Sequence, residues 1–148
     1  GLLLTEKFGP RVRLSKVFTD MPLVHDAYRP FGVEAFCRTC KKCADHCPSQ
    51  AISHGEKTTE GPSLSNFSGV EKWYISPEKC FMFWVKNMMD CNNCVMVCPF
   101  NKPAGRLHDA VRFCIRNMPA LNRFMVWMDD LLGYGRFIST DRKDFWES

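Results

Sequence analysis

Eight of the nine cysteines in this 148-residue sequence fall into two spaced runs, and these runs are the part of the chain best suited to chemistry. The first run is Cys37-x2-Cys40-x2-Cys43-x3-Cys47-Pro48. Tight turns in such a run let three thiolates converge on three corners of an iron–sulfur cubane, while the fourth cysteine crosses to a second cluster. The remaining corner of the first cubane must be filled from elsewhere in the chain. This run therefore predicts one [4Fe–4S] cluster and one ligand of another.

The second run is a variant in which the first ligand lies further upstream. It reads Cys80-x10-Cys91-x2-Cys94-x3-Cys98-Pro99. By the crossing rule, one cluster is expected to be held by Cys37, Cys40, Cys43 and Cys98. The other cluster is expected to be held by Cys47, Cys80, Cys91 and Cys94. Crossed ligands keep two clusters close enough for fast electron transfer, so the pair is predicted to act as a short electron-transfer chain.

Zinc and disulfides are the competing explanations for closely spaced cysteines. Zinc takes four ligands in a structural site and has no use for a cysteine triplet followed by Cys-Pro. Disulfides suit small secreted scaffolds with an even number of cysteines, whereas this sequence has nine. The ninth, Cys114, stands on an apolar helical face and is interpreted as a buried core thiol.

Basic residues flank both runs: Arg38, Lys41, Lys42, Lys79 and Lys102. Positive charge near a cluster stabilises its reduced, more negative state and raises its potential. Simple solvation of a loop side chain explains any one of these residues equally well. Asp129 and Asp130, near a predicted helix end, are interpreted as surface charge.

Aromatic residues gather around the start of the second run: Trp73, Tyr74, Phe81, Phe83 and Trp84. Packing around the clusters is the first interpretation, because a dry shell helps to set the potential. An apolar pocket beside a cluster, lined by residues 80–84, is the alternative. The sequence leaves both open.

The composition is that of a globular chain with a weak net charge. The sequence is 45% hydrophobic and 24% charged, and its 20 basic and 16 acidic residues give +4. This charge is too small and scattered to favour nucleic acid as a partner. The longest apolar runs are far too short to span a bilayer. The sequence opens without Met, as though inside a strand, and is interpreted as a piece of a longer protein.

Three stretches differ in character, and the first comprises residues 1–31. It is predicted to form two strands around a turn at residues 7–10. In the second strand, alternation would place Val12, Leu14 and Phe18 on one face, against a core.

The other two stretches comprise residues 32–102 and 103–148. The first of them holds both cysteine runs, separated by a polar surface loop at residues 54–69. The last stretch is predicted to be helical, because apolar residues recur there at helical spacing. The helices are expected over residues 107–118 and 121–132, the second stopped by Gly133 and Gly135.

The runs that flank the cysteines resemble those of a known enzyme family. They are residues 9–23 (GPRVRLSKVFTDMPL), 36–43 (FCRTCKKC) and 128–135 (MDDLLGYG). Together with the shifted second cysteine run, they resemble the C-terminal part of the corrinoid-dependent reductive dehalogenases, and within these the chloroethene reductases. The resemblance covers essentially the whole chain.

The resemblance implies an α+β fold with three parts. Residues 1–31 would be the end of a nitroreductase-like α/β corrinoid-binding domain. Residues 32–102 would be a ferredoxin-like unit with two [4Fe–4S] clusters, and residues 103–148 a C-terminal helical segment. The family's proton-donating tyrosine and most corrinoid contacts would lie upstream of Gly1, so the chain is expected to be an incomplete fragment of the enzyme.

The resemblance also assigns roles to two residues outside the cysteine runs. Arg13 matches a basic active-site residue, whose charge could stabilise departing halide or the anion of a proton donor. Trp84 matches an aromatic wall of the substrate pocket. Without the resemblance, Arg13 would be interpreted as an exposed strand residue. Asp90 replaces an aromatic residue of some members, so it is left out of the site.

The function implied is that of an oxidoreductase, in which electrons pass through two clusters to corrinoid cobalt and halide is removed from an organohalide. Chlorinated ethenes are the substrates expected of this subgroup. The expected partners are a respiratory electron donor and a small membrane-anchor protein, at the outer (periplasmic) face of the cytoplasmic membrane. The alternatives are a stand-alone ferredoxin-like electron carrier and an epoxyqueuosine-reductase-like enzyme. The residues around Arg13 and the run at 128–135 favour the dehalogenase.

Overall fold

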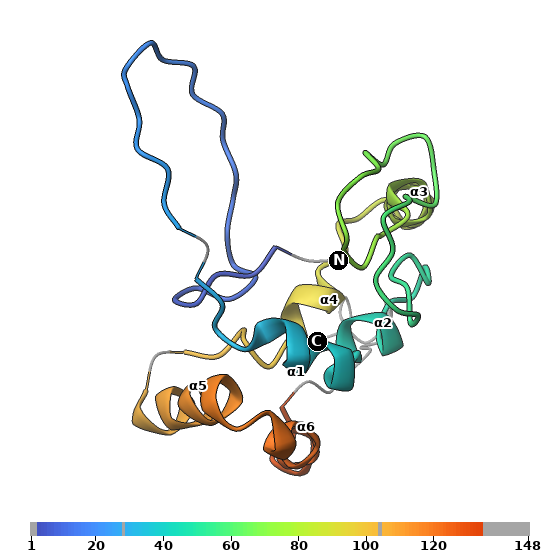
Figure 1. Cartoon of the computed structure of the whole chain (residues 1–148). Coiled ribbons are helices and arrows are strands. Elements are labelled where there is room, and N and C mark those ends of the chain that lie inside the picture. The colour runs from blue at the N-terminus through green and yellow to red at the C-terminus, as the bar shows by residue number, and fades with distance from the viewer. Residues whose placement is uncertain (1–2, 28, 104, 135–148) are drawn as a thin grey trace.

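Helices make up all the regular secondary structure in the part of the chain that the computed structural model describes, residues 3–27, 29–103 and 105–134 (Figure 1). In order they are α1 (Val33–Cys40), α2 (Lys42–Asp45), α3 (Pro77–Asn87), α4 (Asn93–Met96), α5 (Arg106–Asn117), the 3-10 turn η1 (Pro119–Leu121) and α6 (Asn122–Leu131). None of the helices in these ranges is long and apolar enough to cross a membrane.

The β part of the predicted α+β class is limited, in the described residues, to three isolated antiparallel bridges. The bridges join Thr5 to Gly9, Ile52 to Ile75 and Thr58 to Lys72. The last two tie the segment after the first cysteine run to the segment before α3. The described residues are therefore rich in helix with little strand, and the ferredoxin-like arrangement stays a prediction.

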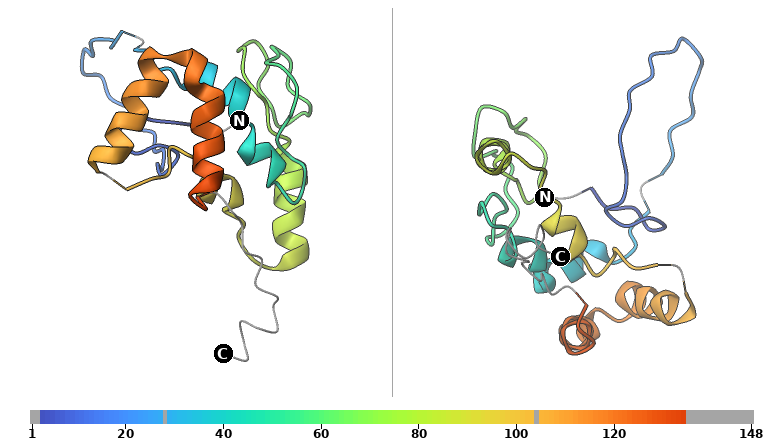
Figure 2. Two further views of the ribbon diagram at one scale, coloured as in Figure 1. Left: turned by 90° about the horizontal axis from the view of Figure 1, so that it is seen from below. Right: turned by 180° about the vertical axis from the view of Figure 1, so that it is seen from behind.

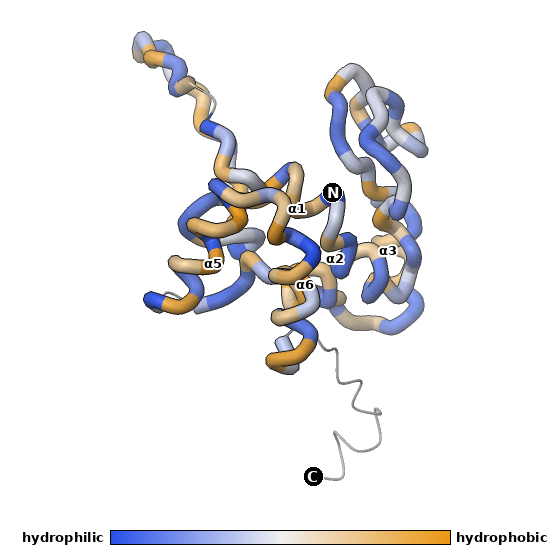
Figure 3. Tube along the Cα trace, turned by 60° about the horizontal axis from the view of Figure 1, so that its bottom comes forward, coloured by the Kyte–Doolittle hydropathy of each residue, from blue (hydrophilic) through white to orange (hydrophobic). Residues whose placement is uncertain are grey.

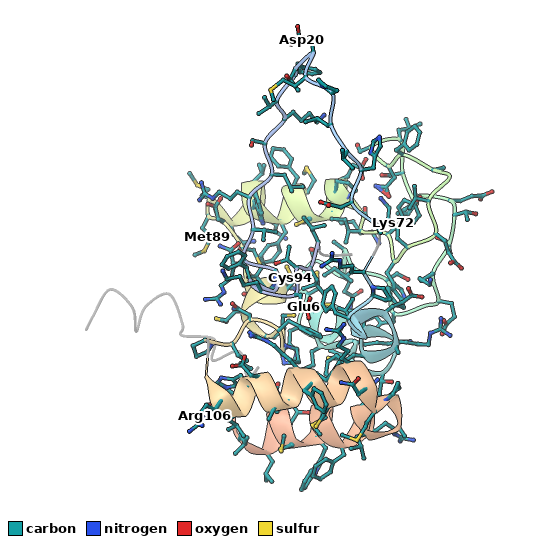
Figure 4. The ribbon with its side chains drawn as sticks, turned by 60° about the vertical axis from the view of Figure 1, so that its left-hand side comes forward. Glu6, Asp20, Lys72, Met89, Cys94 and Arg106 are labelled. Carbon is teal, nitrogen blue, oxygen red and sulfur yellow. The ribbon has the colours of Figure 1, made fainter. Side chains whose placement is uncertain are left out.

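The N-terminal arm, residues 11–27 and 29–30, carries neither helix nor strand and extends away from the helices (Figure 1). Asp20 lies at its far tip (Figure 4). Leu14 is 81% exposed and Phe18 is 94% exposed, so the prediction of strands facing a core is wrong for these residues. An extended segment needs a neighbouring strand or a helix to cover its apolar face, and the described residues offer the arm neither.

The turn predicted before the arm is confirmed, and it packs on the second cysteine run. Thr5 and Gly9 exchange backbone hydrogen bonds of 3.0 and 2.9 Å. Gly9 has φ 58°, and a Cβ at this position would lie 2.2 Å from the carbonyl oxygen of Phe100. Glycine is therefore required here. The guanidinium of Arg11 donates to the carbonyl of Lys102 at 3.2 Å, which fixes the base of the arm.

The core lies where α1, α5 and α6 meet, and α5 and α6 run side by side away from α3 (Figure 2). Phe36 on α1 is 1% exposed, and its ring meets that of Phe100 edge-on, with centroids 5.5 Å apart. Ile115 of α5 and Met125 of α6 complete this cluster. The two C-terminal helices, confirmed where they were predicted, thus cover the first cysteine helix.

The end of α6 is fixed by a glycine, as predicted. Gly133 has φ 75°, and its N–H donates to the carbonyl of Asp130 at 3.0 Å. The N–H of Tyr134 donates to the carbonyl of Asp129, also at 3.0 Å. This pair of bonds is a Schellman motif, which satisfies carbonyls at the end of the helix. Gly135 lies outside the described residues.

The segment between the cysteine runs is a largely hydrophilic loop, as predicted (Figure 3). Tyr74 is 6% exposed, and its hydroxyl lies within donating distance of three loop carbonyls, at 3.0–3.2 Å. These carbonyls belong to Thr59, Phe67 and Val70. The buried Tyr74 side chain therefore links three points of the loop near α3.

Candidate metal centre

The first cysteine run lies on two short helices separated by a sharp reversal. α1 carries Cys37 and Cys40 three residues apart, and therefore on one face. Lys41 then adopts a left-handed conformation with φ 51°, and α2 begins at the next residue. The reversal brings Cys43 near enough that its charge raises the pKa of Cys37, after the larger effects of burial and of the charges on Cys98 and Cys40.

Cys98 joins these three thiols from the second run. The helices α2 and α4 pack together, and the chain leaves α4 through the fully buried Val97. A cavity of about 240 Å³ is then lined by Cys37, Cys40, Cys43 and Cys98. Most of its remaining wall is apolar and includes Phe36, Ile52, Trp73 and Phe100. Four thiols around an apolar chamber form the donor set that a [4Fe–4S] cluster requires.

Burial dominates the electrostatics of this first set. It raises the pKa of Cys37 and of Cys40 to about 12, and that of Cys98 to about 11. Negative charge on the neighbouring cysteines contributes to each of these raised pKa values. Thiolates gathered here would repel one another unless a metal core carried compensating positive charge.

The second set comes from four places in the chain: Cys80 on α3, Cys91 after it, Cys94 on α4 and Cys47 after α2. Burial raises the pKa of Cys80, and the charges of Cys47 and Cys91 add to it. Burial raises the pKa of Cys94 to about 11, followed by the charge of Cys43 from the first set. Cys94 is half-buried on α4 (Figure 4). The structure therefore places the two sets next to each other.

Most of the ten residues inserted between Cys80 and Cys91 continue a helix. α3 begins at Pro77, carries Cys80 in its first turn and runs to Asn87. Met88 then adopts φ 54° and turns the chain toward Cys91. The insertion thus separates Cys80 from Cys91 by most of α3, whereas Cys37, Cys40 and Cys43 of the first run lie close together on α1 and α2.

Backbone N–H groups point at several of the sulfur atoms. The N–H of Ala51 donates to Cys47 Sγ at 3.3 Å, and the Ser49 hydroxyl lies 3.4 Å from the same sulfur. Burial, the largest single effect, raises the pKa of Cys47, but these and other backbone donors outweigh it and lower the pKa below its ordinary value. Donors of this kind stabilise negative charge on a ligand sulfur and tune the cluster it binds.

A single metal ion fits this arrangement poorly. In residues 3–27, 29–103 and 105–134, no three Cys, His, Asp or Glu side chains converge closely enough to hold one ion. The thiolates of a cubane each bind a different iron and need not converge on one point. The spacing of the two cysteine runs in the sequence predicts a cluster rather than zinc.

Two of the flanking lysines are buried against an aspartate on α6. Asp129 Oδ2 lies 2.5 Å from Lys42 Nζ, and its Oδ1 lies 3.2 Å from Lys102 Nζ. The side chains of Lys42, Lys102 and Asp129 are 5%, 10% and 11% exposed. Solvation of loop lysines is thus the wrong interpretation for this pair. Surface charge is likewise wrong for Asp129, whereas Asp130 is 53% exposed and lies 2.7 Å from Lys42.

The role of Asp129 was missed because a pair of acidic residues near a helix end usually faces solvent. Its spacing carried a signal, since Asp129 stands four residues after the buried Met125 and so shares its helical face. Burial lowers the pKa of Lys42 most strongly, yet hydrogen bonds to Asp129 and Asp130 more than compensate and raise it. Lys42 is therefore held as a cation beside the first cysteine run.

The other predicted site residues lie on separate elements. Arg13 is exposed on the N-terminal arm. Trp84 is half-buried on α3, and its indole N–H is buried without a hydrogen-bond partner among the described residues. Cys114 on α5 packs against the core, as expected of a core thiol, although it is half-buried and not fully buried. Phe81 is 61% exposed, so in this chain it does not form part of a dry shell.

Comparison with known proteins points to one family. A family profile described as a 4Fe-4S double cluster binding domain matches residues 36–101. The tetrachloroethene reductive dehalogenase of Sulfurospirillum multivorans is 50% identical over 135 residues, which cover 91% of this chain. The solved structure of the catabolic reductive dehalogenase NpRdhA superposes with a TM-score of 0.77 at 33% identity, over 91% of this chain. The resemblance to the reductive dehalogenases is confirmed.

The match extends along the chain but covers only part of each reductive dehalogenase. The chain spans 27% of the Sulfurospirillum enzyme and 19% of NpRdhA. A further solved structure of a reductive dehalogenase, described as suggesting a mechanism for B12-dependent dehalogenation, also superposes with a TM-score of 0.77 at 33% identity. The chain therefore matches a 4Fe-4S double cluster binding domain over residues 36–101 and is similar to part of the reductive dehalogenases along most of its length.

The crossed ligand sets predict which cysteine variants resemble each other. Cys98→Ala should remove the same cluster as Cys37→Ala, although Cys98 belongs to the second run. Cys91→Ala should remove the second cluster, the one predicted to be held by Cys47, Cys80, Cys91 and Cys94. Electron paramagnetic resonance of the reduced protein checks this, because each variant retains the spectrum of one cluster. Cys114→Ala is the matched control and should retain both. A Cys98→Ala spectrum that matches Cys91→Ala would contradict crossed ligation.

Proposed function

We propose that this chain is the iron–sulfur part of a reductive dehalogenase that acts on organohalides, among which chlorinated ethenes are the first candidates. Cys37, Cys40, Cys43 and Cys98 would hold one [4Fe–4S] cluster. The other cluster would be held by Cys47, Cys80, Cys91 and Cys94. The observation that carries the proposal is the apolar cavity ringed by four thiols, in a chain 50% identical to a tetrachloroethene reductive dehalogenase.

The chain's own residues would hold the clusters, exclude water and supply hydrogen bonds. The wall formed by Phe36, Trp73 and Phe100 keeps the first thiol set dry. The donors to Cys47 stabilise charge on the ligand proposed to cross to the second cluster. Because the two cysteine sets lie next to each other, the electron-transfer path between the two clusters would be short. These features suit repeated one-electron transfer, and replacement of a halogen by hydrogen needs two electrons and one proton.

A corrinoid would supply the halide-releasing chemistry in the full-length protein, and the N-terminal arm suits a place against it. The arm exposes Leu14, Val17 and Phe18, which is unfavourable unless another surface covers them. We take residues 1–31 as the end of a nitroreductase-like corrinoid domain. Residues 32–102 would be the ferredoxin-like unit and residues 103–148 its helical flank. The same exposure disfavours a stand-alone electron carrier.

Arg13 and Trp84 would belong to the substrate site of the assembled enzyme. Arg13 offers a fixed positive charge on the arm, where departing halide or an anionic proton donor could be stabilised. Trp84 offers a half-buried aromatic surface on α3, beside the second cluster ligands. An electron donor of a respiratory chain, a small membrane-anchor protein and the outer face of the cytoplasmic membrane complete the proposal.

The metal content tests the cluster assignment directly. Anaerobic reconstitution should give about eight iron and eight sulfide per chain, because each of two cubanes holds four of each. Colorimetric iron and sulfide analysis measures both. A value near four of each, or zinc in place of iron, would overturn the ligand assignment.

The role of Arg13 is tested in the full-length enzyme. Arg13→Gln should lower kcat/KM for tetrachloroethene by about 10²- to 10³-fold, the size of effect expected when a fixed charge-stabilising group is lost. Its iron content should not change. Lys16→Gln, on the same exposed arm, is the matched control and should leave kcat/KM nearly unchanged. Equal losses in both variants would rule out a specific role for Arg13.

A further inference from the structure

One buried group of charges joins both cysteine runs to α6. Lys42 lies between two ligands of the first run, and Lys102 follows the second run. Asp129 contacts both of their ammonium groups, at 2.5 and 3.2 Å. We call these three residues the Asp129 group. The Lys102 ammonium also lies 4.0 Å from the ring centre of Tyr134, which covers it from a further side.

The Asp129 group carries a net positive charge in a buried setting. Two lysines and one aspartate give +1, and none of the three side chains is more than 11% exposed. Asp130 also contacts Lys42, but its side chain is 53% exposed, so solvent screens its charge. The buried charge is therefore felt at longer range than an exposed ion pair would be.

This charge lies beside the first set of thiols. Lys42 stands two residues after Cys40, and Lys102 stands four residues after Cys98. Both cysteines line the cavity ringed by four thiols, and Lys102 and Asp129 line a smaller cavity directly behind Phe36 and Phe100.

We propose that Asp129 is a positioning residue that sets the reduction potential of the first cluster by holding Lys42 and Lys102 beside it. This inference rests on the two-cluster function proposed above. A cluster gains one negative charge on reduction, so nearby cations raise its potential and nearby carboxylates lower it. Asp129 fixes both lysines in place while offsetting one of their two charges.

The proposal predicts shifts of opposite sign in variants of one charge group. Asp129→Asn leaves two buried cations and should raise the potential of the first cluster. Lys102→Met keeps the side-chain stem, removes one cation and should lower it. Each should change the ratio of reduced to oxidised cluster about tenfold at fixed potential, which is 59 mV for a one-electron couple. The variant that combines Asp129→Asn with Lys102→Met restores the net charge of +1, so the potential of its first cluster should return close to the native value. Asp130→Asn, whose carboxylate is exposed, should shift the potential least.

The measurement is a redox titration of the full-length holoprotein, followed by electron paramagnetic resonance, with iron analysis of every variant. Absence of clusters from the native protein would refute the proposed function itself. Clusters retained with no shift, or with equal shifts in both clusters, would overturn the inference alone. Shifts of the same sign in Asp129→Asn and Lys102→Met would also overturn it. Damage to packing would shift the potential in the same direction in both variants, whereas the charge argument requires opposite directions. If Asp129→Asn fails to retain iron, Lys42→Met and Lys102→Met carry the test, because both must lower the potential.

Discussion

A cubane has four corners, and one closely spaced cysteine run can reach only three of them. The rest of the structure follows from this constraint. The two runs must meet, so α2 packs against α4 and buried Val97 leads Cys98 into the chamber formed by α1 and α2. The helices α5 and α6 then cover α1 from the other side, around Phe36 and Ile115. The C-terminal helices thus complete the support that positions the thiols.

Thiolates that lie together in an apolar chamber repel one another, and two features of the chain offset their negative charge. Backbone N–H groups aimed at sulfur, such as that of Ala51, offset charge locally. Buried lysines from both runs offset it at longer range, and Asp129 holds them. The carboxylate of Asp129 offsets one of the two buried charges and so reduces the cost of burying both lysines there. The helical flank therefore contributes to the electrostatics of the site as well as to its packing.

The sequence predicted local features well and long-range features unevenly. The spacing from Leu107 to Met118 identified α5, and Gly133 marked the end of α6, because both are set by short-range backbone geometry. Alternation in the N-terminal arm predicted a strand, but a strand also needs a neighbour, and periodicity does not supply one. Asp129 was misjudged for a similar reason, since its burial depends on Lys42, 87 residues away in the chain. The crossed assignment of Cys47 and Cys98 stays a prediction.

The crossed assignment is the central claim, and a crystal structure of the anaerobically reconstituted protein at the iron absorption edge tests it most directly. Anomalous difference density should show two four-iron clusters, one bound by Cys98 together with Cys37, Cys40 and Cys43. Cys47 should bind the other. Density in which Cys47 and Cys98 each bind the cluster of their own run, or in which single ions replace cubanes, would contradict the account.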